Sequence, residues 1–526
     1  MMPSIINEDT ESIISSSSGK RENNISETNC PIIHKESLLY PIFLCLLISF
    51  GGFIFGWDVG TIGGIVNMKE FKNHFGTQYN SELNTNEFPN YLTGLIIGIF
   101  NIGCAVGGIF LVKVGDYLGR KIGITVALVI YTVGVLVQVV KDNSWHQFIG
   151  GRIICGLGVG ANTVLVPMFI AESAPVNIRG AMVVLFQLMV TFGILAGNIT
   201  NYFCVKFIKD SNMTWGVPLG LGLVWAALLL VGLIFVPESA EYLMLKKMDE
   251  NKARASFAKM NGIQPDDPKA NEFMNDMQEK LYLITQESVK NRQWHEFVSG
   301  KPKLGLRLTI GILLMAFQQL TGINYFFYYG TALFESAGMK DPYSGVIILS
   351  VVNFVSTFGG IYLVESWGRK ISLFFGSIGM TICMIIYASI GSFALGKSGA
   401  VWGMIVITCA YIFFFATTSG PVTFVIVSEL FPMRTRAISM AICSATNWII
   451  NFFISLLIPI ISAKIDFFLG YIFAFFLFLS IFFVLFLVPE TQGKTSDQID
   501  QIYGSDDSEY SGDESYQPSS SLLKTY

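Results

Sequence analysis

The chain has 526 residues, of which 52% are hydrophobic and only 14% are charged. Soluble domains carry roughly 25% charged residues, so this composition excludes an ordinary soluble globular protein and indicates an integral membrane protein. The formal net charge is −4 and no large basic block is present, which argues against a nucleic-acid partner.

The first 40 residues are polar and rich in Ser, and we expect residues 1–40 to form a disordered cytoplasmic tail. A cleavable signal peptide would begin with basic residues followed by an apolar run, and this stretch does not follow that pattern. We therefore expect the first apolar segment to act as its own insertion signal.

Apolar runs of about 20 residues, the length that crosses a bilayer as a helix, recur through the rest of the chain. They predict an all-α membrane protein with about twelve transmembrane helices in two groups of six. The runs are too long and too uniformly apolar for a transmembrane β-barrel, whose strands would alternate in polarity over about ten residues. The predicted segments are 41–66, 90–112, 122–140, 147–171, 181–204, 216–236, 307–331, 344–364, 372–395, 401–428, 437–462 and 467–488.

Two charged residues lie inside the apolar runs of the first half. Asp58 stands in FGWDVG of segment 1, and Arg152 stands in GGRIICG of segment 4. Charges are costly inside a membrane and usually serve a function, so we treat both as candidate functional residues.

The loops of the two halves repeat each other. GDYLGRK after segment 2 is echoed by VESWGRK after segment 8, and AESAPVNIRG after segment 4 is echoed by SELFPMRTRA after segment 10. Two six-helix halves related as parallel repeats are typical of secondary transporters. The sequence therefore predicts an N-terminal half at 41–236 and a C-terminal half at 307–488.

Each repeated loop contains a carboxylate and a guanidinium at the membrane edge. The simplest alternative is ordinary solvated surface charge, but the recurrence at matching positions favours a cytoplasmic gate that latches the halves together and releases them. One exposed pair contributes about 1 kcal/mol or less, so such a gate needs a network. The gate residues are Asp116 with Arg120, Glu172 with Arg179, Glu365 with Arg369, and Glu429 with Arg436.

The polar stretch 237–306 separates the halves and contains amphipathic runs such as EYLMLKKMDENKARASFAKM, which predict a linker of short surface helices. Lys and Arg are more numerous in the even-numbered loops, mainly because of this linker. The positive-inside rule then places the linker and both termini in the cytoplasm.

Segment 7 contains QQLTGINYFFYYG, in which amides interrupt an apolar run. An uncharged polyol carries hydroxyls that donate and accept, and amides offer both functions. On an unbroken helix Gln319 and Asn324 would point about 140° apart, at 100° per residue. We therefore expect Thr321 and Gly322 to break the helix, which is tolerated where the backbone lines a cavity.

Other amides and aromatic rings extend this candidate site. The alternative role of a lone intramembrane amide is to join helices by hydrogen bonds, and aromatic residues in membrane helices usually pack. The amides are Gln187, Gln318, Gln319, Asn324, Asn353, Asn447 and Asn451, and the rings are Tyr325, Phe326, Tyr328, Tyr329, Phe424 and Trp448.

The motifs, taken in order, resemble those of the sugar porters of the major facilitator superfamily. Their sequences are most similar to those of fungal hexose transporters. The motifs are GGFIFGWDVGTIGG, GDYLGRK, GRIICGLGVG, the Glu/Pro/Arg loops, PESAEYL, QQLTGINYFFYYG and PETQGK, and they span roughly residues 40–495. The resemblance implies a multi-pass carrier in the plasma membrane that moves hexoses by alternating access, with glucose, fructose and mannose as substrates. The residues themselves show no catalytic constellation and no metal-ligand spacing, so we expect no enzyme activity, no cofactor and no metal.

The resemblance also assigns roles to residues. All seven amides match positions where sugar porters contact sugar. Asp58 and Arg152 match a pair that couples protons in some symporters, but fungal facilitators also keep the Asp, so we expect facilitated diffusion and retain proton symport as the alternative. Phe424 stands where many relatives have Trp, and Ala416 stands where many mammalian-type relatives have Glu.

Further alternatives are a carrier of another polyol or pentose and a non-transporting glucose sensor. Known sensors with this fold look as if they need a much longer cytoplasmic C-terminal tail, which makes the sensor the weaker alternative. We expect residues 489–526 to form a cytoplasmic C-terminal tail. Its part from Gly504 onward is acidic, Ser-rich and poor in apolar residues, and we expect that part to be disordered and to be modified by kinases or ubiquitin machinery. We expect the transport unit to be a monomer whose other contacts are with the lipid bilayer.

Overall fold

The computed structural model describes residues 39–81, 85–140, 144–175, 179–208, 211–247, 249–288, 300, 303–395, 397, 399–494 and 496–504. Nearly all of the predicted N-terminal tail, and the C-terminal tail beyond residue 504, lie outside these residues. The helices described below belong to one unit that begins at Leu38.

Eleven stretches of the described chain are long and apolar enough to cross a membrane as helices. The last of them, Ile438–Leu487, is 50 residues long and contains two helices, α19 (Met433–Ile465) and α20 (Leu469–Leu487), which the short 3-10 turn η3 (Asp466–Phe468) joins. Counted separately, they complete the twelve predicted membrane helices. The predicted all-α membrane fold is therefore confirmed.

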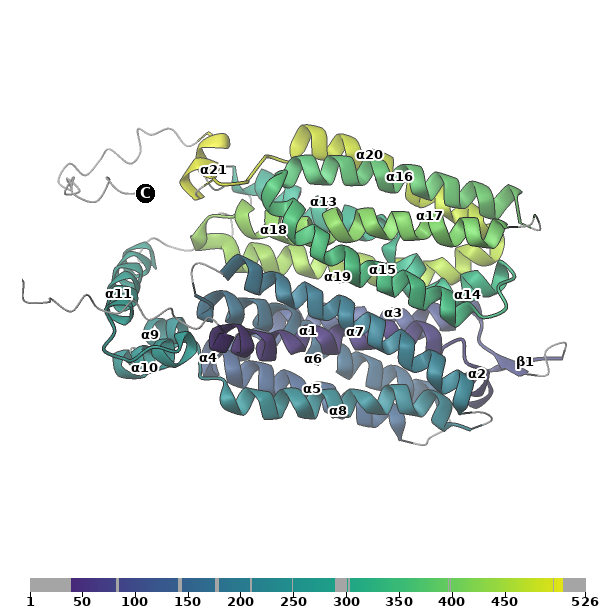
Figure 1. The fold of residues 1–526 in the computed structure, drawn as a ribbon, viewed down its shortest axis with the longest axis horizontal. Helices are drawn as coiled ribbons and strands as arrows, with labels where there is room; N and C mark the ends of the chain where they lie inside the picture. Colours follow the sequence, from purple (N-terminus) through teal and green to yellow (C-terminus); the bar gives the residue numbers. More distant parts are fainter. Residues whose placement is uncertain are drawn as a thin grey trace, which may run out of the picture. The chain divides into compact units, whose positions relative to one another are not determined.

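The first half contains six membrane passes, and Figure 1 draws its purple to blue helices side by side. The passes are α1 (Leu39–Ile65), α3 (Asn90–Phe110) continued by α4 (Val112–Leu118), α5 (Arg120–Val139), α6 (Trp145–Ser173), α7 (Arg179–Phe207) and α8 (Met213–Phe235). A short helix α2 (Lys69–Phe75) and an antiparallel hairpin of β1 (Gln78–Asn80) and β2 (Thr85–Glu87) follow α1. These small elements were not predicted.

The linker forms three helices, α9 (Ala240–Lys247), α10 (Glu250–Asn261) and α11 (Pro268–Ser288). Helix α9 contacts α6 and α10 contacts α1, so these helices lie at one end of the first half, which we call the linker end. Helix α2 and the hairpin lie at the opposite end (Figure 1), which we call the hairpin end.

The second half repeats the first, with two interruptions of its helices. Its elements are α13 (Leu304–Leu320), α14 (Ile323–Ser336), α15 (Pro342–Ser366), α16 (Arg369–Phe393), α17 (Ala400–Phe414), the π-helix η2 (Phe415–Ser419), α18 (Gly420–Leu430), α19, α20 and α21 (Ser496–Ile502). The π-helix contains Ala416 and was not predicted. Such π-turns inside α-helices are frequent at functional sites.

The repeated GRK loops adopt the same backbone conformation in both halves. Gly119 precedes α5 with φ +119°, and Gly368 precedes α16 with φ +89°. Only glycine adopts such angles without strain. A side chain at Gly368 would also lie 2.8 Å from the carboxylate of Glu490, and one at Gly119 would collide with that of Glu238. The sequence repeat is therefore also a structural repeat.

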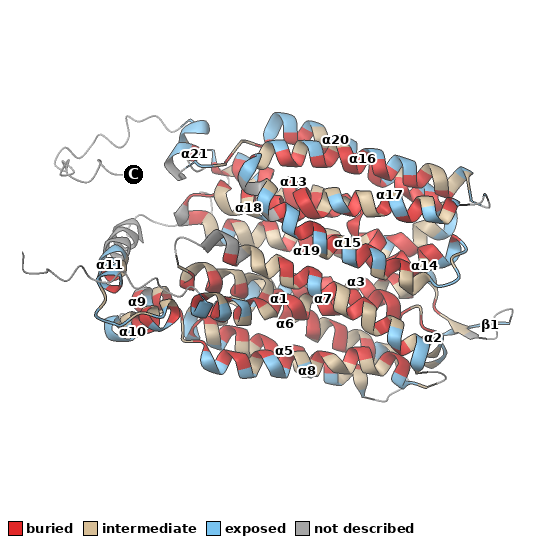
Figure 2. Ribbon diagram, in the orientation of Figure 1, coloured by how far each residue is buried: buried red, intermediate tan, exposed pale blue. Residues whose placement is uncertain are grey.

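The halves meet along three pairs of helices, in which α3 packs against α19, α7 against α15 and α1 against α14. Gly94 and Gly98 of α3 face Leu456 and Phe452 of α19, and glycine permits such close backbone approach. Figure 2 shows buried residues where helices face one another. The outer face of α20 instead exposes apolar side chains suited to lipid, namely Phe475, Phe478, Phe482 and Phe486.

Candidate functional site

The predicted break in segment 7 is confirmed. Helix α13 ends at Leu320 and α14 begins at Ile323, and Gly322 between them has φ +86°. The Thr321 hydroxyl donates to the carbonyl of Gln318 at 2.7 Å, and the Tyr411 hydroxyl donates to the carbonyl of Thr321 at 2.8 Å. These bonds satisfy backbone groups that the break releases from the helix.

The break returns Asn324 to the helix face that carries Gln319. Asn324 Nδ2 donates to Gln319 Oε1 at 2.7 Å, and Gln319 Nε2 donates to Asn447 Oδ1 of α19 at 2.9 Å. Asn447 Nδ2 in turn donates to Gln318 Oε1 at 2.6 Å. Three helices thus bring four of the predicted amides into one hydrogen-bonded group.

Asn451 extends this group toward the first half. Its Oδ1 accepts from Asn324 Nδ2 at 2.9 Å, and its Nδ2 donates to Asn101 Oδ1 of α3 at 3.2 Å. Asn101 was not among the predicted residues, although a single amide inside the apolar run of segment 2 was a signal for it. We call the group of Gln318, Gln319, Asn324, Asn447, Asn451 and Asn101 the amide cluster.

The two remaining predicted amides lie elsewhere. Gln187 is half-buried on α7, and Asn353 is buried on α15. Within the described residues, neither side chain hydrogen-bonds to the amide cluster.

The predicted aromatic residues lie in different surroundings. Tyr325 packs against Tyr387 and Phe473, with ring centroids 6.1 and 5.7 Å apart, so its ring belongs to the core of the second half. Trp448, next to Asn447, meets Phe55 of α1 at 5.3 Å and so contacts the first half.

Of the remaining four rings, Phe326 packs in the core of the second half, with its centroid 5.0 Å from that of Tyr387. The Tyr328 hydroxyl accepts from Asn451 Nδ2 of the amide cluster at 3.5 Å.

Tyr329 and Phe424 lie at different depths. The Tyr329 hydroxyl donates to the carbonyl of Ser455 on α19. Phe424 of α18 is 45% exposed, the most open of the predicted site rings.

Asp58 and Arg152 form a buried ion pair between α1 and α6. Arg152 Nη1 lies 2.6 Å from Asp58 Oδ2, and the two side chains are only 1% and 6% exposed for Arg152 and Asp58 respectively. The guanidinium also lies 4.5 Å from the centre of the Phe100 ring on α3. The pair therefore joins three helices of the first half.

The first half carries a charged network at the linker end. Arg120 lies 2.7 Å from Asp116 and 2.9 Å from Glu172, whose carboxylate also accepts from the Ser239 hydroxyl. The Glu238 carboxylate accepts from the backbone N–H of Lys121 at 3.1 Å, at the start of α5. A carboxylate at a helix N-terminus is favourable because of the helix dipole.

The second half repeats the contacts of Arg120 with Glu172 and of the Glu238 carboxylate with the helix N-terminus. Arg369 lies 3.0 Å from Glu429, which also accepts from the Thr491 hydroxyl. The Glu490 carboxylate accepts from the backbone N–H groups of Arg369 and Lys370, both at 3.0 Å. The PES and PET motifs at the ends of the two halves thus supply equivalent partners to the two networks. The similarity of the two motifs could have indicated this from the sequence.

The predicted pair of Asp116 with Arg120 is present within its loop, at 2.7 Å. The rest of the predicted gate needs two corrections. Arg120 and Glu172 come from different loops, so the observed pairing crosses between the loops of one half, because packing of α5 on α6 brings these loops together. Each observed pair also joins helices of the same half, so these contacts stabilise a half and do not latch the two halves together. The side chains of Arg179 and Glu365 lie outside the described residues.

Arg436 binds differently from the predicted pairing with Glu429. Its Nε donates to the carbonyl of Phe431 at 3.1 Å. Burial lowers the pKa of its guanidinium, the nearby charge of Arg307 lowers it further, and Glu429 partly opposes both effects.

Arg307 anchors the end of the described chain and was not predicted. Its side chain is 0% exposed, its Nη1 lies 2.6 Å from Asp500 Oδ1 of α21, and its Nε donates to the carbonyl of Leu430 at 2.7 Å. The guanidinium also lies 5.1 Å from the centre of the Tyr503 ring. Helix α21 is therefore held against the second half.

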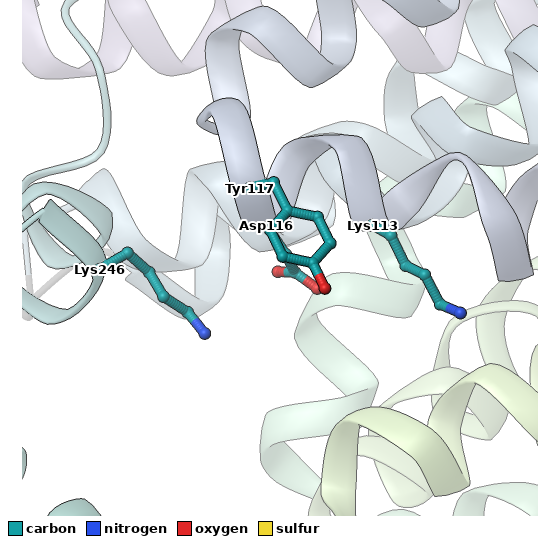
Figure 3. Close-up of a pocket in the computed structure, with 4 residues that line it drawn as sticks. All are labelled: Lys113, Asp116, Tyr117 and Lys246. Atoms are coloured by element: carbon teal, nitrogen blue, oxygen red, sulfur yellow. The ribbon is translucent and has the colours of Figure 1, made fainter.

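A surface pocket of about 380 Å³ opens beside the first network at the linker end, and Figure 3 shows Lys113 and Lys246 on either side of Asp116 and Tyr117. A second cavity, lined in part by Gln318 and Thr321, has a volume of only about 20 Å³, which is enough for about one water and far too small for a sugar. The candidate site is therefore identified by its converging amides and not by an empty volume. No group of three His, Cys, Asp or Glu side chains suited to a metal occurs in the described ranges.

The chain is similar in sequence to known sugar transporters. The family model described as "Sugar (and other) transporter" matches residues 44–503. Hexose transporter HXT14 of Saccharomyces cerevisiae is 50% identical over 498 residues, which are 92% of each chain. The low-affinity glucose transporter of Kluyveromyces lactis is 42% identical over 89% of this chain and 83% of its own.

Solved structures of the xylose transporter XylE from E. coli are similar in fold. Its partially occluded inward open form has a TM-score of 0.71 and 28% identity, over 87% of this chain and 99% of the other. The proton:xylose symporter XylE of the major facilitator superfamily, bound to 6-bromo-6-deoxy-D-glucose, has a TM-score of 0.73 and 27% identity, over 88% and 99% of the two chains.

Proposed function

The chain belongs to the sugar (and other) transporter family, and on this premise we propose that it carries hexoses across a membrane by alternating access of its two halves. Glucose is the expected principal substrate, with fructose and mannose as further substrates. The observation that carries the proposal is the amide cluster at the break between α13 and α14. The yeast relatives, named hexose and glucose transporters at 42–50% identity, favour hexoses over pentoses.

The amide cluster fits a ligand with several hydroxyls. Its amides hydrogen-bond to one another, so a hexose can replace these bonds with matched donors and acceptors. Because one set of bonds is exchanged for another, the net gain per bond is small, about 1 kcal/mol. Weak net binding suits a carrier, which must release its substrate on the far side.

We propose that further predicted residues complete the sugar site around this cluster. Gln187 and Asn353 would add amides from α7 and α15, one from each half. The rings of Trp448, Tyr329 and Phe424 would cover the apolar faces of the sugar, and Tyr325 would support them from the adjacent core.

Alternating access requires contacts between the halves that break in turn. Asn198 Nδ2 donates to Ser350 Oγ at 3.0 Å, and the Tyr343 hydroxyl donates to the carbonyl of Gly64 at 3.1 Å. Both bonds join the halves between the amide cluster and the hairpin end. We propose that they close the outer side, while the repeated networks keep each half rigid at the linker end as it moves.

We propose that transport is facilitated diffusion. The Asp58–Arg152 pair is buried inside one half, and Arg152 Nη1 donates to both carboxylate oxygens at 2.8 and 2.6 Å, which favours a structural role. Proton symport is the competing function because XylE, a proton:xylose symporter by its description, shares the fold. External pH decides between them: sugar addition should leave it unchanged, whereas sugar-induced alkalinisation that Asp58→Asn abolishes would establish symport.

The direct test of transport uses cells that lack their own hexose carriers. Expression of the chain should restore saturable uptake of radiolabelled glucose, and a protonophore should not reduce it. A chain that reaches the surface without restoring uptake would support the alternative of a glucose sensor. Uptake of a pentose or another polyol in preference to every hexose would support the alternative substrate class.

We propose a plasma-membrane location, with the linker end and both termini in the cytoplasm and a monomeric transport unit in the lipid bilayer. The multi-pass character rests on the membrane helices. Kinases or ubiquitin machinery would act on the tails, which lie mostly outside the described residues. We assign residues 41–236 and 307–488 to the two halves and residues 237–306 to the linker.

A further inference from the structure

Asn101 is the member of the amide cluster that comes from the first half. It lies on α3 at the interface with α19, and its side chain is 0% exposed. The other five members lie on helices of the second half. Any ligand that binds this cluster and also contacts Asn101 would therefore bridge the two moving parts.

The orientation of the Asn101 amide follows from its neighbour. Asn451 Oδ1 already accepts from Asn324 Nδ2 at 2.9 Å and from the Ser455 hydroxyl at 3.3 Å. Asn451 Nδ2 is thus left to donate, and it does so to Asn101 Oδ1 at 3.2 Å and to the Tyr328 hydroxyl at 3.5 Å. Asn101 Nδ2 consequently points away from Asn451.

Asn101 Nδ2 has no hydrogen-bond partner among the described residues, although it is fully buried. A buried donor without an acceptor is unfavourable, and such groups are rare in folded proteins. A donor left unpaired beside five amides that pair with one another is suited to an acceptor that arrives with a ligand.

We propose that Asn101 is a specificity-determining residue of the sugar site, whose Nδ2 donates to one hydroxyl oxygen of the hexose. The inference rests on the proposed function and assigns the first half a direct bond to the substrate at α3. With Asn451 on one side and the sugar on the other, Asn101 connects substrate binding in the second half to the position of the first. Sugars that lack the accepting hydroxyl lose this bond.

The alternative is that Asn101 only joins α3 to α19. The two roles differ in a measurable way, because a bond to one hydroxyl affects one position of the sugar, whereas a bond between helices affects all sugars equally.

The experiment measures inhibition of radiolabelled glucose uptake in cells that lack their own hexose carriers. The competitors are glucose and its deoxy and fluoro analogues at each hydroxyl, tested on the full-length wild type, Asn101→Ala and Asn101→Ser. The inhibition constant of a competitor does not depend on how much carrier reaches the surface. Asn101→Ser serves the same comparison where the alanine variant folds poorly.

Asn101→Ala should raise the inhibition constant of glucose about fivefold, the effect of one lost neutral hydrogen bond. The deoxy analogue that lacks the accepting hydroxyl should inhibit the variant and the wild type equally, because it cannot accept a hydrogen bond from Asn101 in either protein. Asn201→Ala is the matched control: Asn201 is a buried asparagine on α7 that donates to the carbonyls of Gly60 and Thr61 at 3.3 and 2.9 Å within the first half. It should show no analogue-selective change.

An equal change for every analogue in Asn101→Ala and Asn101→Ser, or slower turnover at unchanged inhibition constants, would overturn the assignment of Asn101. Absence of saturable uptake by the wild type would overturn the proposed function itself, and this inference with it. The two failures are therefore distinguishable in one set of measurements.

Discussion

Asn324 links the two sides of the helix break through one amide group. Its Nδ2 donates both to Gln319 Oε1 at 2.7 Å and to Asn451 Oδ1 at 2.9 Å. Sequence reasoning predicted that a break would bring Gln319 and Asn324 together, because their spacing on a continuous helix would separate them. It could not predict which amide would bond to which, because those bonds depend on the packing of α19.

Asn324→Ala or Gln318→Ala should therefore remove most hexose uptake without removing the carrier from the surface. Loss of one or two neutral hydrogen bonds of about 1 kcal/mol each corresponds to a reduction in uptake efficiency of roughly 5- to 30-fold. Initial uptake rates normalised to surface-biotinylated protein provide the measurement. Thr309→Ala is the control, since this exposed residue of α13 bonds only to the carbonyl of Gly305 on its own helix. Near-normal affinity and rate in both cluster variants would refute the proposed site.

Asp58→Asn should chiefly impair folding. The substitution removes the negative partner of Arg152 and leaves a buried cation, and breaking a buried pair in this way costs about 3–5 kcal/mol. The amount of carrier at the surface and its thermal stability in detergent should both fall. Asp249→Asn, at an exposed helix cap that pairs with Lys252, should leave both unchanged. Wild-type stability of Asp58→Asn would contradict the structural role.

At the scale of single elements, the bend between α13 and α14 depends on Gly322. Its φ of +86° is unfavourable for other residues, and an added Cβ would lie 2.6 Å from the Phe473 ring. Gly322→Ala should therefore reduce both the amount of folded carrier and its uptake per molecule. Gly220→Ala on α8 is the matched control, because a Cβ there meets nothing within 4 Å. Unchanged uptake per molecule in Gly322→Ala would show that the amide cluster does not need this bend.

Helix α21 separates the part of the C-terminal region that supports the fold from the tail beyond it. Ile499 and Tyr503 are buried against the second half, and Asp500 pairs with Arg307. The predicted cytoplasmic tail at 489–526 thus contains an ordered helix, α21, which ends before the stretch from Gly504 that we expect to be disordered. Truncation after Gly504 keeps these contacts and should preserve uptake per surface molecule.

Truncation after Lys494 should behave differently, because it leaves the Arg307 guanidinium buried without Asp500. The shortened carrier should be less stable and less abundant at the surface. Asp500→Asn should cause a smaller loss of stability and surface abundance, since the amide oxygen can still accept a hydrogen bond from Arg307. Equal abundance and thermal stability of the two truncated chains would exclude a stabilising role for α21.

At the scale of the whole molecule, the two charged networks are equivalent parts of two repeated halves. Arg120 with Glu172 and Ser239 corresponds to Arg369 with Glu429 and Thr491. Since both networks lie at the linker end and outside the amide cluster, we expect them to control how the halves move and not how tightly sugar binds.

Arg120→Ala and Arg369→Ala should accordingly slow turnover several-fold more than they weaken sugar affinity. The comparison uses the maximal exchange rate and the inhibition constant of glucose in the same cells. Lys252→Ala, which removes the exposed partner of Asp249 in the linker, is the charge-matched control and should change neither. A variant with weakened binding and a normal exchange rate would contradict this division of roles.

The sequence by itself determined the class of fold, the number of membrane helices and the identity of most of the candidate site. Hydrophobic length dictates whether a helix can cross a bilayer, and this property is local. The repeated GRK, Glu/Pro/Arg and PES/PET motifs are equally visible without coordinates. Amides inside an apolar run stand out because their burial requires partners.

Only the tertiary structure decided which groups are those partners. Arg120 meets Glu172 across 52 residues of sequence, and Asn451 meets Asn101 across 350. Such pairings arise when whole helices pack, and no local property of the chain encodes them. For the same reason, the sequence predicted the pair of Asp116 with Arg120 within one loop, but not that packing of α5 on α6 would bring Glu172 of another loop to the same guanidinium.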